Sequence, residues 1–95
     1  MRITEEERAV LLHAIQKADP DAKLWLFGSR VDDTKRGGDI DVAVLSTRIG
    51  RQEQRTIRRA IEDALGEQRI DLVVSADGQD PFFRLAIEKG IRIDE

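Results

Sequence analysis

The strongest constraint on this fold is an amphipathic segment that lies between two short apolar runs. Apolar residues recur in it at spacings of three and four, which place them on one face of a helix: Ile57, Ala60, Ile61, Ala64 and Leu65. Gly66 follows, where a helix end favours a residue without a β-carbon. The flanking segments, 39–45 and 69–74, are short and have the apolar patterns of strands. A helix that crosses between two strands joins parallel neighbours, so both strands start at one edge of the sheet.

Helices and strands alternate through the rest of the chain. Thr4 and Glu7 have the spacing of a capping box, which marks the start of a first helix. Asp80 is the expected N-cap of a last helix, and Gly90 closes that helix. The predicted elements in chain order are a helix over about 5–18, strands over 23–27 and 39–45, a helix ending at Leu65, a strand over 69–74, a helix starting at Pro81 and a short edge strand over 91–93.

The loop at 29–38 decides how the first two strands pair. Its ten residues are too few for a crossover helix, so we expect these strands to be antiparallel. The end of the first strand then returns to the edge at which the second and third strands begin. The expected fold class is therefore α/β (α+β), a small mixed β-sheet with helices packed on it. The residues that converge at this edge are Gly28, Asp39, Asp41 and Asp71.

Composition argues against several classes of protein. The 95 residues predict one domain, 1–95, because a second core would halve a chain already near the lower end of domain sizes. The absence of cysteine and the single histidine argue against thiol chemistry, multi-histidine zinc sites and a Ser-His-Asp triad. A net charge of −3 gives no global positive field for duplex nucleic acid. Short apolar runs and an acidic N-terminus predict a cytoplasmic protein without a membrane span or signal peptide.

Three carboxylates predict a metal site at the converging edge. Asp39 and Asp41 stand two residues apart on a strand, so their side chains share one face, with α-carbons about 6.6 Å apart. Asp71 begins the neighbouring strand and adds a third carboxylate. Three close carboxylates repel one another, and divalent cations relieve this repulsion. Because the ligands are all oxygen atoms, we expect two Mg²⁺ or Mn²⁺ ions rather than zinc.

A candidate phosphate site adjoins the carboxylates. Gly28 allows a phosphate to approach the backbone, and Ser29 can donate its hydroxyl. Arg30, Lys35 and Arg36 supply the positive charge that clamps a metal-bound triphosphate and stabilises the leaving pyrophosphate. The sequence therefore predicts an anion site and a metal site side by side.

These motifs resemble the GS…DxD…D signature of the polymerase-β-like nucleotidyltransferase superfamily, and the chain is similar in size to its minimal members, the minimal nucleotidyltransferase (MNT) family. The motifs are Phe27-Gly28-Ser29-Arg30, Gly37-Gly38-Asp39-Ile40-Asp41-Val42 and Ile70-Asp71-Leu72-Val73, within roughly residues 24–74. The resemblance implies the polymerase-β-like core, in the order α-β-turn-β-α-β-α. It implies that Asp39 and Asp41 hold two Mg²⁺ ions, and that Asp71 helps bind the catalytic metal and activate the attacking hydroxyl. Gly28 and Ser29 would then hold the nucleotide phosphates.

The resemblance also implies an activity and a partner. The expected reaction is transfer of AMP from ATP to an acceptor hydroxyl. Minimal members commonly pair with a helical HEPN RNase toxin and act as its antitoxin by modifying a tyrosine. The expected partner is therefore a HEPN-type toxin encoded nearby, in a hetero-oligomer.

One departure from the family pattern favours an alternative. Minimal members often have a small residue, a basic residue and glycine where this chain has Val31-Asp32-Asp33. The two acids favour a noncatalytic antitoxin or scaffold that inhibits its partner by binding alone. Transfer to a small antibiotic-like molecule ranks last, because the chain has no recognisable binding domain for one.

Simpler interpretations of individual residues stay open. Asp71 can be a strand-edge acid that pairs with Arg69 or Arg92. The four aromatic side chains are most simply core residues that pack helices on the sheet, although the last two can instead face a partner: Trp25, Phe27, Phe82 and Phe83.

Overall fold

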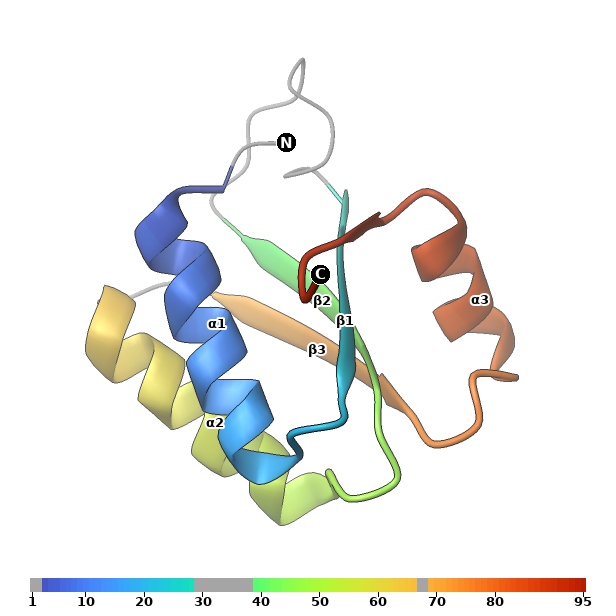
Figure 1. Ribbon diagram of the computed structural model, residues 1–95, viewed down its shortest axis with the longest axis horizontal. Helices are drawn as coiled ribbons and strands as arrows, with labels where there is room; N and C mark the ends of the chain where they lie inside the picture. The colour runs from blue at the N-terminus through green and yellow to red at the C-terminus, as the bar shows by residue number, and fades with distance from the viewer. Residues whose placement is uncertain (1–2, 29–38, 67–68) are drawn as a thin grey trace.

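The computed structural model describes residues 3–28, 39–66 and 69–95, and its helices and strands follow the predicted order (Figure 1). Each predicted element is present: β1 has the predicted bounds, and the bounds of the other strands differ from the prediction by at most one residue. The elements are α1 Glu5–Ala18, β1 Lys23–Phe27, β2 Ile40–Leu45, α2 Arg51–Leu65, β3 Ile70–Ser75, α3 Pro81–Glu88 and β4 Ile91–Arg92.

The four strands form one mixed sheet in the order β3-β2-β1-β4. β2 and β3 are parallel, as expected for strands joined by the crossover helix α2. β1 is antiparallel to β2, and β4 is antiparallel to β1 at the edge of the sheet. The prediction that the end of β1 meets the starts of β2 and β3 is therefore confirmed, and so is the predicted fold class.

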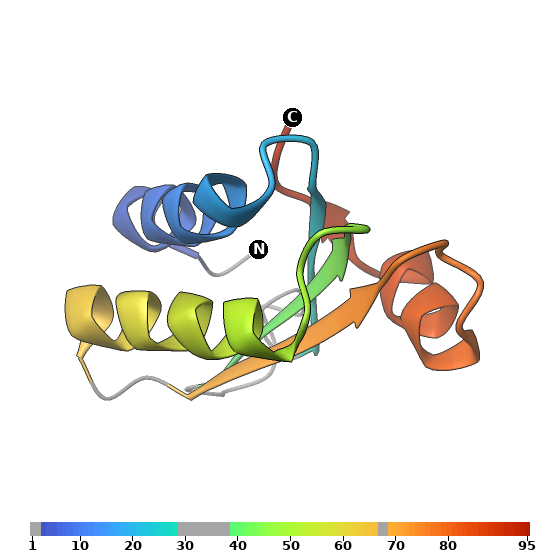
Figure 2. The ribbon, with the colours of Figure 1, turned by 90° about the horizontal axis from the view of Figure 1, so that it is seen from below.

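Helices cover both faces of the sheet, and each face has its own core. α1 and α2 lie on one face and α3 lies on the other (Figure 2). Alternate strand residues point to opposite faces, so the two cores take different residues from the same strands. The α1/α2 side buries Leu11, Ile15, Leu24, Leu26, Ile40, Val42, Ile57, Ile61 and Leu72. The α3 side packs Trp25, Phe27, Ala43, Val73, Phe83 and Ala86.

Local signals at the helix ends are confirmed with one correction. Thr4 and Glu7 form the predicted capping box at the start of α1. Gly66 ends α2 with a φ of +84°. Asp80 occupies the N-cap position of α3, but its side chain does not cap the helix. Its carboxylate instead accepts a hydrogen bond from the Ser75 hydroxyl, which ties the start of α3 to the end of β3.

A buried carboxylate joins the end of α1 to the loop before α2. Ser46 Oγ donates to Asp19 Oδ2 over 2.6 Å, and both residues are buried. This hydrogen bond lowers the pKa of Asp19 despite the opposing effect of burial. The same hydroxyl accepts hydrogen bonds from the backbone amides of Arg48 and Ile49. Ser46 therefore fixes the turn from which α2 starts.

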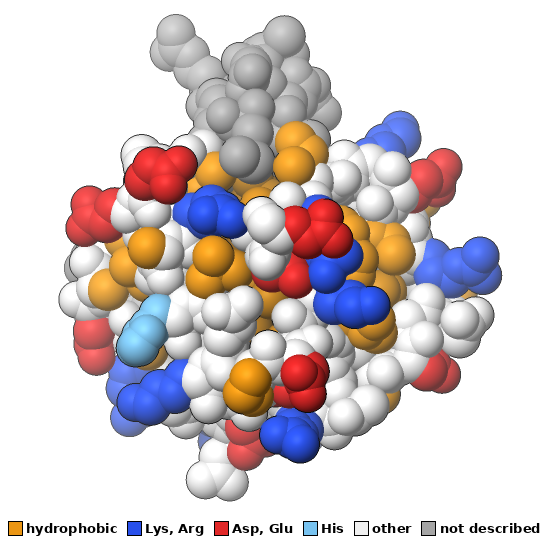
Figure 3. Space-filling view, in the orientation of Figure 1, with side chains coloured by type: hydrophobic (Ala, Val, Ile, Leu, Met, Phe, Trp, Pro, Cys, Tyr) orange, Lys and Arg blue, Asp and Glu red, His pale blue; other side chains and the backbone are white. Residues whose placement is uncertain are grey.

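The surface carries both signs of charge and an exposed aromatic ring. Acidic and basic side chains are interspersed on the face shown in Figure 3. Phe83 is buried, as expected of a core residue, whereas Phe82 is 61% exposed. The core interpretation of Phe82 is therefore wrong, because one helical position turns its ring away from the sheet. Among the described residues, no helix is long and apolar enough to cross a membrane.

Candidate active site

Strand register places two of the predicted carboxylates in one row across the sheet. Asp41 on β2 lies directly beside Asp71 on β3 in the parallel ladder. On the other side, Asp41 lies opposite Phe27, the last residue of β1, in the antiparallel ladder. The row therefore comes from three adjacent strands, and the prediction that Asp41 and Asp71 converge is confirmed by the backbone itself.

Both carboxylates point to the face of the sheet that carries α3. The neighbouring positions on the same strands, Ala43 and Val73, pack in the α3 core. Asp41 and Asp71 each stand two residues before these positions, and a strand repeats its facing every two residues. α3 therefore covers the apolar part of this face, while the carboxylates lie at the end where β2 and β3 begin.

The surroundings of Asp41 hold its proton. The pKa of Asp41 is raised from 3.8 to about 6, chiefly by burial and also by a hydrogen bond with Asp71 and by the negative charges of Asp71 and Asp39. The guanidinium of Arg69 opposes this increase. Asp41 therefore ionises at a higher pH than an ordinary aspartate, and its carboxyl forms a pair with that of Asp71 through a hydrogen bond.

Arg69 links the remaining carboxylate to this pair. Its Nε atom lies 3.7 Å from Asp71 Oδ2 and 4.0 Å from Asp39 Oδ2. The Arg69 side chain is 73% exposed, so solvent screens both ion pairs. The sequence allowed an ion pair of Asp71 with Arg69 or with Arg92, and in the structure Asp71 pairs with Arg69. Arg92 instead pairs with Asp94 and Glu95.

Gly28 fits against the carboxyl pair in a way that only glycine permits. It follows β1 directly and has a φ of +77°, a conformation that side chains strain. A β-carbon at this position would overlap the carboxylate of Asp41. The backbone of Gly28 therefore approaches the Asp41 side chain closely, and the predicted convergence of these two residues is confirmed. The other predicted phosphate-binding residues lie outside the described part of the chain: Ser29, Arg30, Lys35 and Arg36.

The carboxylates fit a divalent cation by their chemistry. Among the described residues, no three acidic or histidine side chains are gathered closely enough to enclose a metal ion as they stand. The carboxyl groups of Asp41 and Asp71 nevertheless lie within hydrogen-bond reach of each other, and a divalent cation would relieve the repulsion between their charged forms. Oxygen-only donors suit Mg²⁺.

An apolar pocket lies beside Gly28, and the sequence did not predict it. Its volume is about 200 Å³, and its lining residues are Phe27, Gly28, Phe82, Leu85, Ala86 and Lys89. Phe82 and Leu85 are 61% and 62% exposed. One sequence pattern could have predicted this pocket. Phe82 and Leu85 stand three residues apart and give α3 a second apolar stripe beside that of Phe83 and Ala86.

Comparison with known proteins agrees with the motifs. A family model described as polymerase beta, nucleotidyltransferase matches residues 11–95, which include the whole candidate site. Among the curated proteins, none matches the chain.

Proposed function

The chain belongs to the polymerase β nucleotidyltransferase family, and we propose that it transfers AMP from ATP to the hydroxyl group of an acceptor. The observation that carries this proposal is the position of Asp41, which lies beside Asp71 in the strand register and against Gly28 at the end of β1. Gly28, whose backbone could receive a phosphate, and the Asp41–Asp71 pair, which could bind a cation, therefore lie at one edge of the sheet. Nucleotidyl transfer in general follows from the family. ATP as the nucleotide and a hydroxyl group as the acceptor are what we propose.

The reaction needs one bond to form and one to break. The acceptor oxygen attacks the α-phosphorus of ATP, the bond from that phosphorus to the bridging oxygen breaks, and pyrophosphate leaves. Asp71, to which the resemblance assigns activation of the attacking hydroxyl, would accept the proton of that hydroxyl. The products are the adenylylated acceptor and pyrophosphate.

Two Mg²⁺ ions fit this proposal as cofactors. Asp39, Asp41 and Asp71 would hold them, and when bound they would neutralise the charge of the triphosphate and of the leaving pyrophosphate. Arg69 lies within 4.0 Å of two of these carboxylates and supplies positive charge at the same edge.

The proposed acceptor is a tyrosine of a partner HEPN RNase toxin, for which this chain would act as the antitoxin. The resemblance of the Gly28, Asp39–Asp41 and Asp71 motifs to minimal nucleotidyltransferases supports this role. The exposed apolar side chains of α3 beside the site support contact with a second protein.

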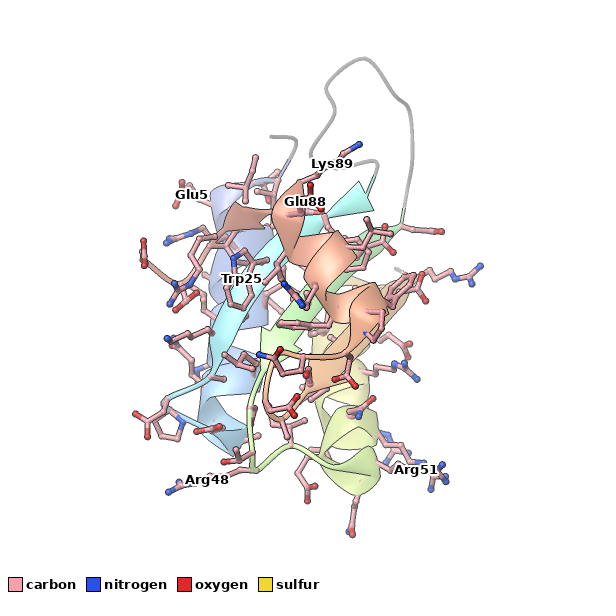
Figure 4. All side chains as sticks on the ribbon, turned by 90° about the vertical axis from the view of Figure 1, so that its right-hand side faces the viewer. Glu5, Trp25, Arg48, Arg51, Glu88 and Lys89 are labelled. Atoms are coloured by element: carbon pink, nitrogen blue, oxygen red, sulfur yellow. The ribbon has the colours of Figure 1, made fainter. Side chains whose placement is uncertain are left out.

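The test is transfer of label from ATP to the product of the adjacent gene in the presence of Mg²⁺. Asp39→Asn and Asp41→Asn should each abolish transfer and should each fail to neutralise the toxin in cells. Arg51→Gln serves as the control, since Arg51 starts α2 at the opposite end of the molecule (Figure 4). Neutralisation that survives both aspartate variants would instead favour the alternative, a noncatalytic antitoxin that acts by binding.

A further inference from the structure

The apolar pocket beside Gly28 has no role in the transfer chemistry described above. We propose that it binds the aromatic side chain of the acceptor and directs its hydroxyl toward Asp41. This inference rests on the proposed nucleotidyl transfer and adds the residues that select the acceptor. We call the site the acceptor pocket and define it by Phe27, Gly28, Phe82, Leu85, Ala86 and Lys89.

The walls of the acceptor pocket are rigid aromatic and aliphatic groups. The rings of Phe27 and Phe82 meet edge to face, with centroids 6.4 Å apart and planes at 79°. On the next residue of α3, Phe83 is buried and packs edge to face on Trp25 at 5.7 Å. α3 is thus anchored on the sheet through Phe83, and this anchor places Phe82 on the helix side that contacts Phe27.

The pocket shares Gly28 with the surroundings of Asp41. Gly28 lines the pocket and also lies against the carboxylate of Asp41. Gly28 therefore connects the pocket to Asp41, and a side chain that extends past Gly28 would bring its end toward the carboxylates. A tyrosine has the required form, because its apolar ring can contact Phe27 and Phe82 while its hydroxyl reaches the carboxyl pair.

Polarity and position favour an acceptor ring over the nucleobase. The pocket volume of about 200 Å³ is enough for one planar ring system. The lining side chains are apolar except for Lys89, whose ammonium can only donate hydrogen bonds. An adenine amino group needs an acceptor, and a ribose separates the base from the phosphorus that reacts beside Asp41.

The positive charge of Lys89 gives the pocket a preference for acceptors with negative charge nearby. It follows α3 at the end of the molecule where β1 also ends, away from Arg48 and Arg51 (Figure 4). An ammonium at the rim favours a tyrosine with acidic neighbours in the acceptor chain. The exposed Leu85, one helical turn earlier, offers apolar surface to the same segment.

The test measures binding of a capped peptide with one tyrosine between two glutamates, by NMR titration, in parallel with binding of ATP and Mg²⁺. Phe82→Ala and Leu85→Ala should each weaken peptide binding at least fivefold and leave the affinity for ATP unchanged. Both side chains are largely exposed, so the fold should tolerate their removal. Ile91→Ala is the matched control, because Ile91 is an exposed apolar residue outside the pocket. A peptide with phenylalanine in place of tyrosine should bind within a few-fold of the first.

Each other outcome has a distinct meaning. Peptide binding that is unchanged in both variants would overturn the acceptor pocket. Loss of ATP affinity in these variants would overturn it too, and would assign the pocket to the nucleobase. A wild-type protein that binds the peptide through Phe82 and Leu85 but neither binds nor consumes ATP would support the pocket and refute the proposed nucleotidyl transfer.

Discussion

Replacing Asp41 with asparagine should stabilise the metal-free protein, and only where the carboxyl is ionised. Its pKa is about 6 in the folded chain, against an ordinary value of 3.8. Below pH 3.8 the carboxyl is neutral in both the folded and the unfolded chain. As the pH rises through about 6, the folded chain loses the stability that the neutral form contributed, because ionisation adds the cost of burial and of repulsion by Asp71 and Asp39. Asparagine keeps the neutral form at every pH.

The structure sets the size of this effect. A pKa raised from 3.8 to about 6 corresponds to about 3 kcal/mol if it converts fully into stability. Asp41 is only half-buried, so solvent screening reduces the expected gain to about 1 kcal/mol. For a domain of this size the gain raises Tm by about 4–8 °C. Thermal unfolding followed by circular dichroism, in a chelating buffer at pH 4 and pH 8, measures it.

The control for this experiment is Asp39→Asn. The Asp39 side chain is 50% exposed and lies outside the strand, so its replacement should change Tm by less than that of Asp41 at pH 8. An Asp41→Asn variant that gains as much stability at pH 4 as at pH 8 would refute the electrostatic reasoning. A variant that loses stability at pH 8 would refute it as well.

Three further substitutions test neighbouring parts of the account. Gly28→Ala should destabilise the fold by about 1–3 kcal/mol and lower nucleotide affinity, because a β-carbon there is strained by the positive φ and overlaps Asp41; chemical denaturation and ATP binding measure the two effects. Ser46→Ala should cost about 1–3 kcal/mol in urea unfolding, because it leaves the buried Asp19 without its hydroxyl donor. Arg69→Gln should tighten Mn²⁺ binding by a few-fold, a gain that shrinks at high salt, because its guanidinium no longer competes for Asp39 and Asp71; calorimetric titration at two salt concentrations tests this, and weaker binding would contradict it.

The fold was largely predictable because local patterns and topology agreed. The crossover helix over Arg51–Leu65 requires parallel strands, and the short connection after β1 favours an antiparallel pair. These two strand directions alone bring Gly28, Asp41 and Asp71 to one edge of the sheet. The Asp80 side chain was less predictable, because a residue that fits an N-cap can also accept a hydrogen bond from Ser75, and the choice depends on where β3 ends.

Side-chain environment was the part of the site that sequence could not supply. The spacing of Asp39 and Asp41 predicts a shared face, but the burial and the hydrogen bond with Asp71 that raise the pKa of Asp41 depend on the packed sheet. The exposure of Phe82 beside the buried Phe83 depends on how α3 rotates against Trp25. Adjacent aromatic residues at a helix start do not define that rotation.

The central claim is that the edge formed by Gly28, Asp41 and Asp71 binds a metal-bound nucleotide. Anomalous diffraction from crystals grown with Mn²⁺ and a non-hydrolysable ATP analogue locates the metal directly. We predict an anomalous peak within coordination distance of both Asp41 and Asp71, with the phosphates of the analogue against the backbone of Gly28. A nucleotide bound elsewhere, or manganese that avoids this carboxyl pair, would contradict the account.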